Sequence, residues 1–246
     1  MKEATRNIIT IAKKELLSYF NSPLAYVLVV IFLIIAMSFA FLFGGLFERG
    51  EASLTDSFFF WHPWLFMIFA PALGMRRWSE EQRMGTMELL LTMPLASWHA
   101  IVGKFIASAF VLFAALFFTF PIVLTIWYLG DPDNGVIFAG YIASFLLACS
   151  FLAITSAVSA FTRSQVVCFV VAVAICLLTI MGGFPPVVDF LNGWGGIGET
   201  VASFSVLTHF DELTKGVLIP RDIVFFLSLI GFCLFLTAAV IKSKRA

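Results

Sequence analysis

Charged side chains are scarce in this sequence. Of its 246 residues, 12% are Asp, Glu, Lys or Arg, whereas 61% are hydrophobic. Soluble domains carry about 25% charged residues, and a core of this size could not hide so much apolar surface. The scarcity therefore excludes a soluble globular domain and leaves lipid as the solvent for much of the chain. The formal net charge is zero, so we expect no nucleic acid as a partner.

Paired cysteines and phosphate-binding loops are also absent. The four cysteines lie inside apolar runs and form no C-x-x-C pair, so we expect small hydrophobes rather than disulfides or metal ligands at Cys149, Cys168, Cys176 and Cys233. The chain lacks the motif G-x-x-x-x-G-K-[ST], which excludes ATP binding in the manner of P-loop ATPases. We expect no cofactor, no metal and no catalytic residue in this chain.

Two polar features admit other interpretations. A membrane-embedded enzyme would need a catalytic constellation, and the only external cluster is Asp189, His209, Asp211 and Glu212, whose spacing fits helix capping better. His62 stands in a run of aromatic residues that could form a ligand cage or a proton relay. We favour an aromatic belt at the outer membrane interface, with His62 at the level of the headgroups.

Long hydrophobic runs are abundant. A bilayer core about 30 Å thick requires roughly 20 apolar residues in a helix, and six runs qualify without a single Asp, Glu, Lys or Arg. Their apolar residues are continuous and do not alternate with polar ones, so they indicate helices rather than a barrel. We predict an all-α membrane protein with one transmembrane domain, residues 1–246, whose six transmembrane helices are Leu24–Leu46, Ser57–Met75, Phe105–Leu129, Val136–Thr162, Val166–Gly183 and Ile223–Ile241.

Two further helical segments are expected outside these spans. Residues 1–22 carry apolar side chains at helical spacing among charged ones, which predicts an amphipathic helix lying in the membrane interface. Residues 184–222 end in a second amphipathic stretch, for which Thr208 and Asp211 form the predicted N-cap arrangement. This segment is expected to form short external helices before the sixth span.

The distribution of lysine and arginine predicts the orientation, because cytoplasmic loops carry an excess of both. Six spans place the two termini on one side of the membrane. Twelve of the 15 cationic residues fall on that side, and only Arg49, Lys215 and Arg221 fall on the other. Both termini and the loop at 76–104 are therefore expected in the cytoplasm.

The densest charge lies at residues 76–94, RRWSEEQRMGTMELLLTMP. Arg77–Met84 can form two helical turns, and Gly85 can end that helix in a left-handed conformation. Thr86 can then cap a second helix, with Glu88 in its first turn, where a negative charge suits the helix dipole. The pattern predicts a short, bent pair of helices.

An ordinary solvated loop is the simpler interpretation of this stretch, and it accounts for the arginines. It accounts less well for the acidic residues beside a break between two helices. We therefore favour a docking surface for a cytoplasmic partner, with Glu80, Glu81 and Glu88 as its exposed residues.

Residues 80–104, EEQRMGTMELLLTMPLASWHAIVGK, resemble the signature of type-2 (exporter) ABC transporter permeases. In that family an acidic pair precedes Gly-Thr-x-Glu, a leucine run, a proline and a Gly-Lys pair at the third span. The matching positions are Glu80, Glu81, Gly85, Thr86, Glu88, Leu89, Leu90, Leu91, Pro94, Gly103 and Lys104. The resemblance extends over the whole chain, and its C-terminal part is similar to the bacterial gliding-motility-associated permease subgroup.

The resemblance implies a function in the bacterial inner (plasma) membrane. Two permease subunits, as a homodimer or a heterodimer, each dock a separate cytoplasmic ABC ATPase that binds ATP and Mg. Docking uses a coupling region at 76–98, and the residues carried over are Glu80, Glu81, Gly85, Thr86 and Glu88. The coupled work is export or force transmission, and a periplasmic accessory protein is a further expected partner. A membrane scaffold or pore subunit without ATP coupling is the alternative.

Overall fold

The computed structural model describes residues 2–47, 53–85, 97–193 and 196–244. Within these ranges every regular element is a helix and none is a strand, which confirms the all-α class. The helices, with η1 a π-helix and η2 a 3-10 helix, are α1 Lys2–Asn21, α2 Pro23–Ser38, η1 Phe39–Phe43, η2 Phe59–Trp61, α3 His62–Gly74, α4 Arg76–Met84, α6 Ser97–Phe117, α7 Pro121–Leu129, α8 Asn134–Phe161, α9 Gln165–Met181, α10 Pro185–Asn192, α11 Ile197–Ala202, α12 Val206–Thr214 and α13 Pro220–Ser243.

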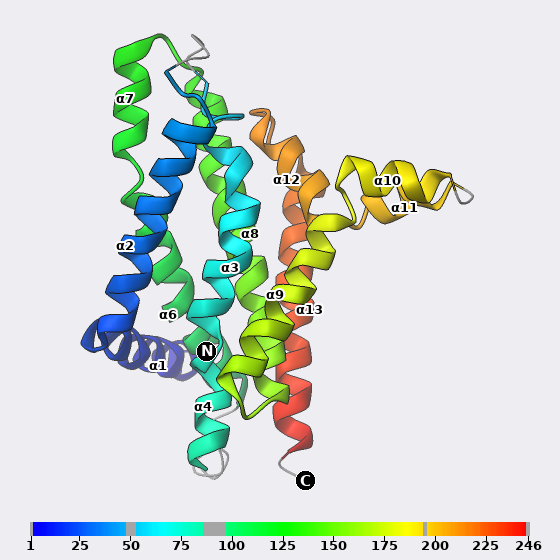
Figure 1. The fold of residues 1–246 in the computed structure, drawn as a ribbon. Coiled ribbons are helices and arrows are strands. Elements are labelled where there is room, and N and C mark those ends of the chain that lie inside the picture. Colours follow the sequence, from blue (N-terminus) through cyan, green and yellow to red (C-terminus); the bar gives the residue numbers. More distant parts are fainter. Residues whose placement is uncertain (1, 48–52, 86–96, 194–195, 245–246) are drawn as a thin grey trace.

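The long helices form a bundle, as Figure 1 shows. α1 lies across the lower end of the bundle in that view and packs against α6 and α2, and α4 and the C-terminal end of α13 reach the same end. α7 and α12 lie toward the opposite end, and α10 and α11 project from the side. The arrangement separates a polar end, where α1 and α4 meet, from the rest of the molecule.

Four helical segments among the described residues are long and apolar enough to cross a membrane: Ala25–Phe43, Ser97–Leu129, Asn134–Phe161 and Pro220–Ser243. α9 and α10 form a fifth if they are taken together as one broken span, with a bend of 66° between them. These segments correspond to five of the six expected spans, and they make the chain a multi-pass membrane protein.

The second expected span, Ser57–Met75, is not one of these segments. Its residues form the short η2 and then the 13-residue α3, and a separate helix, α4, begins at Arg76. Pro63 lies in the first turn of α3, and Pro71 removes a backbone donor from its interior. At 1.5 Å per residue, α3 is about 20 Å long, against a hydrocarbon core of about 30 Å. The length of α3 therefore does not confirm the second span, which stays a prediction.

The segment between α9 and α13 contains α10, α11 and α12. α12 begins after Ser205, whose hydroxyl accepts a hydrogen bond from the Leu207 N–H at 3.2 Å. Ser205 also donates to the Thr179 carbonyl at 2.8 Å, which ties the start of α12 to the end of α9. Thr208 lies inside α12, so the predicted N-cap at Thr208 is wrong and Ser205 takes that position.

α8 is the central helix of the bundle. It contacts α3, α4, α6, α9, α12 and α13, and its small residues allow the neighbours to approach closely. An added Cβ at Gly140 would lie 2.4 Å from the Phe59 ring. His62 is also buried here, with Nδ1 2.6 Å from the Ser144 hydroxyl. The His62 side chain is therefore enclosed by α8 and its aromatic neighbours, and its depth at the level of the headgroups stays a prediction. All four cysteines are buried and unbridged, as predicted.

Candidate functional site

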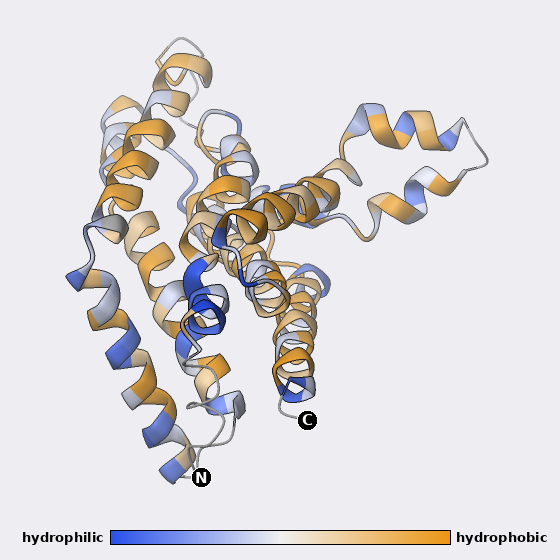
Figure 2. Cartoon of the chain, turned by 60° about the horizontal axis from the view of Figure 1, so that its bottom comes forward, coloured by the Kyte–Doolittle hydropathy of each residue, from blue (hydrophilic) through white to orange (hydrophobic). Residues whose placement is uncertain are grey.

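α4 is a polar helix of nine residues at one end of the bundle. Figure 2 views this end and shows hydrophilic residues concentrated on α4 and along α1. α4 buries Arg77, Trp78 and Ser79, whereas Arg83 is exposed. Gly85 ends the helix with a φ of 71°, a left-handed conformation that glycine adopts without a steric penalty. The predicted helix and its end at Gly85 are confirmed.

A hydroxyl group from α8 bonds the backbone at the junction between α3 and α4. Ser159 Oγ accepts hydrogen bonds from the backbone N–H groups of Trp78 and Ser79, at 2.9 and 3.1 Å. The same hydroxyl donates to the Met75 carbonyl at 3.3 Å. Ser159 therefore bonds backbone groups of Met75, Trp78 and Ser79, next to the point where α3 ends and α4 begins. Ser156 of α8 adds a hydrogen bond from the Trp78 indole, at 3.3 Å.

The other end of α4 is held by α8 and by the end of α13. Gln82 donates from its amide to the carbonyls of Ser159 and Ala160, at 3.3 and 2.8 Å. Lys244, the residue after α13, donates to Gln82 Oε1 and to the Ala160 carbonyl, both at 2.7 Å. Burial and the neighbouring charge of Arg163 lower the pKa of Lys244. α4 is thus tied along its length to the last turn of α8.

A buried lysine joins α4 to α1. Lys104 Nζ of α6 lies 2.7 Å from Glu81 Oε1 and 3.1 Å from Glu15 Oε1. The Lys104 side chain is 7% exposed, and its two partners are 22–24% exposed. Nζ also lies 5.4 Å from the centre of the Trp78 ring, a cation–π contact. One cation therefore connects α1, α4 and α6.

Gly103, next to Lys104, allows α1 to approach α6. An added Cβ at Gly103 would lie 3.0 Å from both the Ile8 carbonyl oxygen and Ile11 Cγ2. The absence of a side chain brings α1 close, and the adjacent Lys104 then reaches Glu15. The Gly-Lys pair of the sequence thus has a physical role at the contact between α1 and α6.

Arg77 is buried beside this ion pair. It is 2% exposed, and its guanidinium nitrogens have no hydrogen-bond partner among the described residues. Burial lowers the pKa of Arg77, while Tyr19 and Glu15 act in the opposite direction. The guanidinium carbon lies 5.9 Å from the centre of the Phe105 ring. An arginine that stays charged in this position calls for an anionic partner.

The predicted site residues divide into three groups. Gly85 has the predicted conformation, and Glu80 is partly exposed on α4. Glu81 is also partly exposed, and its carboxylate pairs with Lys104. Thr86 and Glu88 lie outside the described residues.

The residues that hold α4 were not predicted from the sequence. Ser156 and Ser159 belong to a Ser/Thr-rich part of α8, ITSAVSAFT, and polar residues inside an apolar run were the available signal. No sequence pattern indicated the contact between Gln82 and Lys244, since 162 residues separate them.

The residues named for the enzyme alternative do not form one constellation. His209 Nδ1 lies 2.7 Å from Asp222 Oδ1, and Nε2 lies 3.0 Å from the Ser203 carbonyl oxygen. Glu212 pairs with Arg221 at 2.7 Å. Nδ1 thus holds α12 to α13 and Nε2 holds it to the segment before α12, and Asp189 and Asp211 take no part in the pair. No group of three or more His, Cys, Asp or Glu that could hold a metal occurs in the described ranges.

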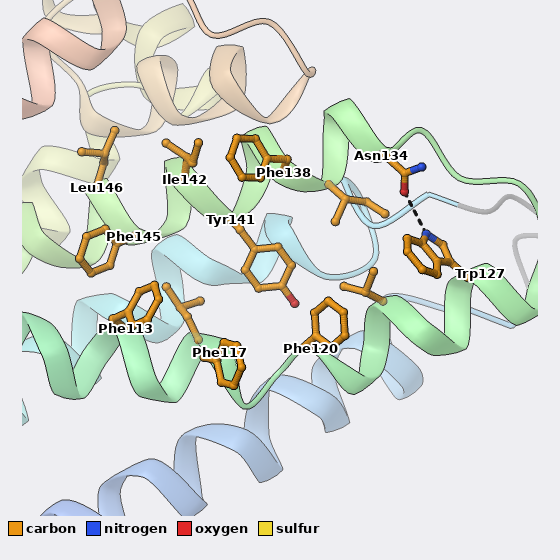
Figure 3. Close-up of a pocket in the computed structure, with 13 residues that line it drawn as sticks. Phe113, Phe117, Phe120, Trp127, Asn134, Phe138, Tyr141, Ile142, Phe145 and Leu146 are labelled. Carbon is orange, nitrogen blue, oxygen red and sulfur yellow. Dashed lines mark hydrogen bonds between the residues drawn. The ribbon is translucent and has the colours of Figure 1, made fainter.

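An apolar groove of about 540 Å³ lies between α6–α7 and α8 (Figure 3). It lies beside the break at which α6 ends and Pro121 starts α7. The Trp127 indole donates a hydrogen bond to Asn134 Oδ1, at 3.0 Å, across one end of the groove. Phenylalanine and aliphatic side chains form most of the wall, which suits hydrocarbon better than a polar ligand.

The family model described as ABC-2 family transporter protein matches residues 9–241. None of the curated proteins matches the chain.

Proposed function

Because the chain belongs to the ABC-2 transporter family, we propose that it is the membrane-spanning permease subunit of an ATP-binding-cassette transporter and that α4 couples it to a separate ATPase. ATP and Mg bind to that partner, and this chain carries no catalytic residue of its own. The work performed is export or force transmission across the bacterial inner membrane.

The proposal places six crossings in the membrane: α2, α3, α6–α7, α8, α9 and α13. The four long apolar segments and the broken α9–α10 pair support five of them. α3 is the sixth, a short crossing completed by its neighbours in the bundle. Six crossings put both termini on one side of the membrane, and the two crossings before α4 put it on that side as well. The excess of lysine and arginine there makes that side the cytoplasm. α1 then lies in the inner interface, and α10–α12 lie on the outer side.

The observation that carries the coupling proposal is the attachment of α4. Its start is held by Ser159, its end by Gln82, and its flank by the Lys104 ion pair. A displacement of α4 therefore acts on α1, α6, α8 and α13 together. Coupling between distant sites needs such a contiguous element with two arrangements, and the α3–α4 junction supplies the point about which α4 can move.

A dimer of permeases with two ATPase subunits completes the proposed assembly. A second copy of this chain and a related chain are both candidates for the other half. A periplasmic accessory protein and a role in gliding motility belong to the same proposal, on the strength of the C-terminal resemblance alone.

The test is co-purification with the ATPase. From its native membrane in mild detergent, the tagged chain is expected to retain a P-loop ATPase. Glu80→Arg and Glu88→Arg are each expected to reduce that ATPase at least tenfold, because both reverse the charge of the docking surface. Glu3→Arg is the matched control, since it makes the same change at an exposed residue of α1.

Each outcome separates the two functions. Loss of the ATPase in the Glu80→Arg and Glu88→Arg variants, with the control unchanged, supports coupling through this region. Capture of no ATPase by the unmodified chain, or equal capture by all variants, would favour the scaffold or pore alternative.

A further inference from the structure

A polar pocket of about 320 Å³ lies between α1 and α4. Ser18 and Tyr19 line it from α1, and Arg76, Arg77 and Glu80 line it from α4. Both helices lie at the polar end of the bundle (Figure 2). The ATPase-coupling proposal uses Glu80 as a docking residue and the Lys104 ion pair as an attachment of α4, but it assigns no ligand to the pocket itself.

Arg77 is the residue in the pocket wall that calls for a ligand. It is 2% exposed, and none of its guanidinium nitrogens is hydrogen-bonded within the described ranges. A buried charge without a hydrogen-bonded partner is costly. Phosphate and carboxylate are the groups that match the guanidinium fork, since two parallel N–H···O bonds can form.

The remaining charges argue against a purely anionic ligand. Lys104 is already engaged by Glu15 and Glu81. Of the other charged residues that line the pocket, α4 contributes two cations, Arg76 and Arg77, and one carboxylate, Glu80. Glu80 makes no ion pair with another described residue. A ligand that carries a phosphate and an ammonium group would complement both signs.

We propose that this pocket binds the headgroup of a zwitterionic aminophospholipid, with Arg77 on the phosphate and Glu80 on the ammonium. The inference rests on the proposed position of α1 in the membrane interface, which brings the pocket to the depth of lipid headgroups. Exposed apolar residues on α1, Ile9, Leu17 and Phe20, support that position. The bound lipid would stabilise the contact between α1 and α4.

The test is lipid binding to the purified, delipidated chain, measured by native mass spectrometry. Phosphatidylethanolamine, phosphatidylcholine and phosphatidylglycerol are added separately at equal concentration. The chain is expected to bind phosphatidylethanolamine most tightly, because only this lipid offers both a phosphate and a hydrogen-bonding ammonium. Arg77→Gln is expected to weaken that binding roughly tenfold to a hundredfold, the effect of losing a charged hydrogen-bonded pair.

Three further variants sharpen the test. Arg77→Lys keeps the charge but not the fork, so it is expected to restore part of the binding. Glu80→Gln is expected to remove the preference for phosphatidylethanolamine over phosphatidylglycerol. Arg83→Gln changes an exposed arginine of the same helix that does not line the pocket, and it is expected to bind like the unmodified chain.

Two results would overturn the inference. One is binding of phosphatidylethanolamine by a folded Arg77→Gln or Arg77→Lys variant at the unmodified level. The other is displacement of the lipid by inorganic phosphate alone, which would indicate a soluble anion instead. Because the ATPase is absent from this experiment, its result is independent of the co-purification test, and failure here leaves the coupling proposal standing.

Discussion

At the scale of single residues, the polar end of this protein depends on a few buried charges and hydroxyls. Lys104 is enclosed by Trp78 and two carboxylates, and Ser159 bonds backbone groups at the α3–α4 junction. In both cases the partners come from other helices, so each interaction also fixes the position of α4. Removing one member of a buried group leaves the others unsatisfied.

Lys104→Met tests this dependence. The change leaves Glu15 and Glu81 as neighbouring carboxylates without their shared cation, and their partial exposure softens the effect. We expect the free energy of unfolding to fall by about 2 kcal/mol, measured by denaturant titration in detergent micelles. The triple variant Lys104→Met/Glu15→Gln/Glu81→Gln is expected to recover most of the loss, because it removes the unpaired charges. Lys13→Met, at an exposed lysine of α1, is the control, and an equal loss there would contradict the prediction.

At the scale of helices, close packing positions α1 and α8. Gly103 lets α1 approach α6, and Gly140 lets Phe59 approach α8. In both places a missing side chain determines a contact between helices. The contact of α1 with α6 is the one that brings Glu15 within reach of Lys104.

A pair of glycine substitutions tests the role of the α1–α6 contact. Gly103→Ala adds a methyl group 3.0 Å from the backbone of α1, whereas nothing lies within 4 Å of a Cβ added at Gly231 in α13. Alanine has a higher helix propensity than glycine at both positions. The two variants therefore differ in overpacking, which occurs at Gly103 alone. We expect Gly103→Ala to be less stable than Gly231→Ala by about 1–2 kcal/mol. Equal stability of the two variants in thermal unfolding would show that α1 is not packed as described.

At the scale of the whole molecule, the bundle separates two ends of different chemistry. α1, α4 and the end of α13 gather at one end, and α7 and α12 lie at the other (Figure 1). A membrane orientation for the bundle predicts which end faces the cytoplasm. The buried native cysteines make this testable by thiol chemistry, because they contribute little background.

Single cysteines at exposed positions report the orientation. Arg83→Cys and Arg163→Cys are expected to resist a membrane-impermeant thiol reagent in intact cells and to react after permeabilisation. Asp131→Cys and Lys215→Cys are expected to react in intact cells, because six crossings place them outside. All four positions are exposed in the structure. Labelling of all four positions from the same side would contradict the six-crossing arrangement.

The sequence by itself determined the features that depend on neighbouring residues. Continuous apolar runs specify helices in lipid, and Gly85 specifies the end of α4 because its left-handed backbone suits glycine. The sequence did not show what holds the junction between α3 and α4, since the Ser159 hydroxyl there comes from 80–84 residues away in the chain.

Only the tertiary structure decided which polar groups meet. In the sequence, Glu81 and Arg77 are both charged residues of one short helix, and nothing there distinguishes their surroundings. The fold gives Glu81 a cation 2.7 Å away and leaves Arg77 without a hydrogen-bond partner in the described ranges. The sequence shows which side chains are charged. Their ion pairs form between helices, and the burial of each charge in the folded protein decides whether it stabilises or destabilises the fold.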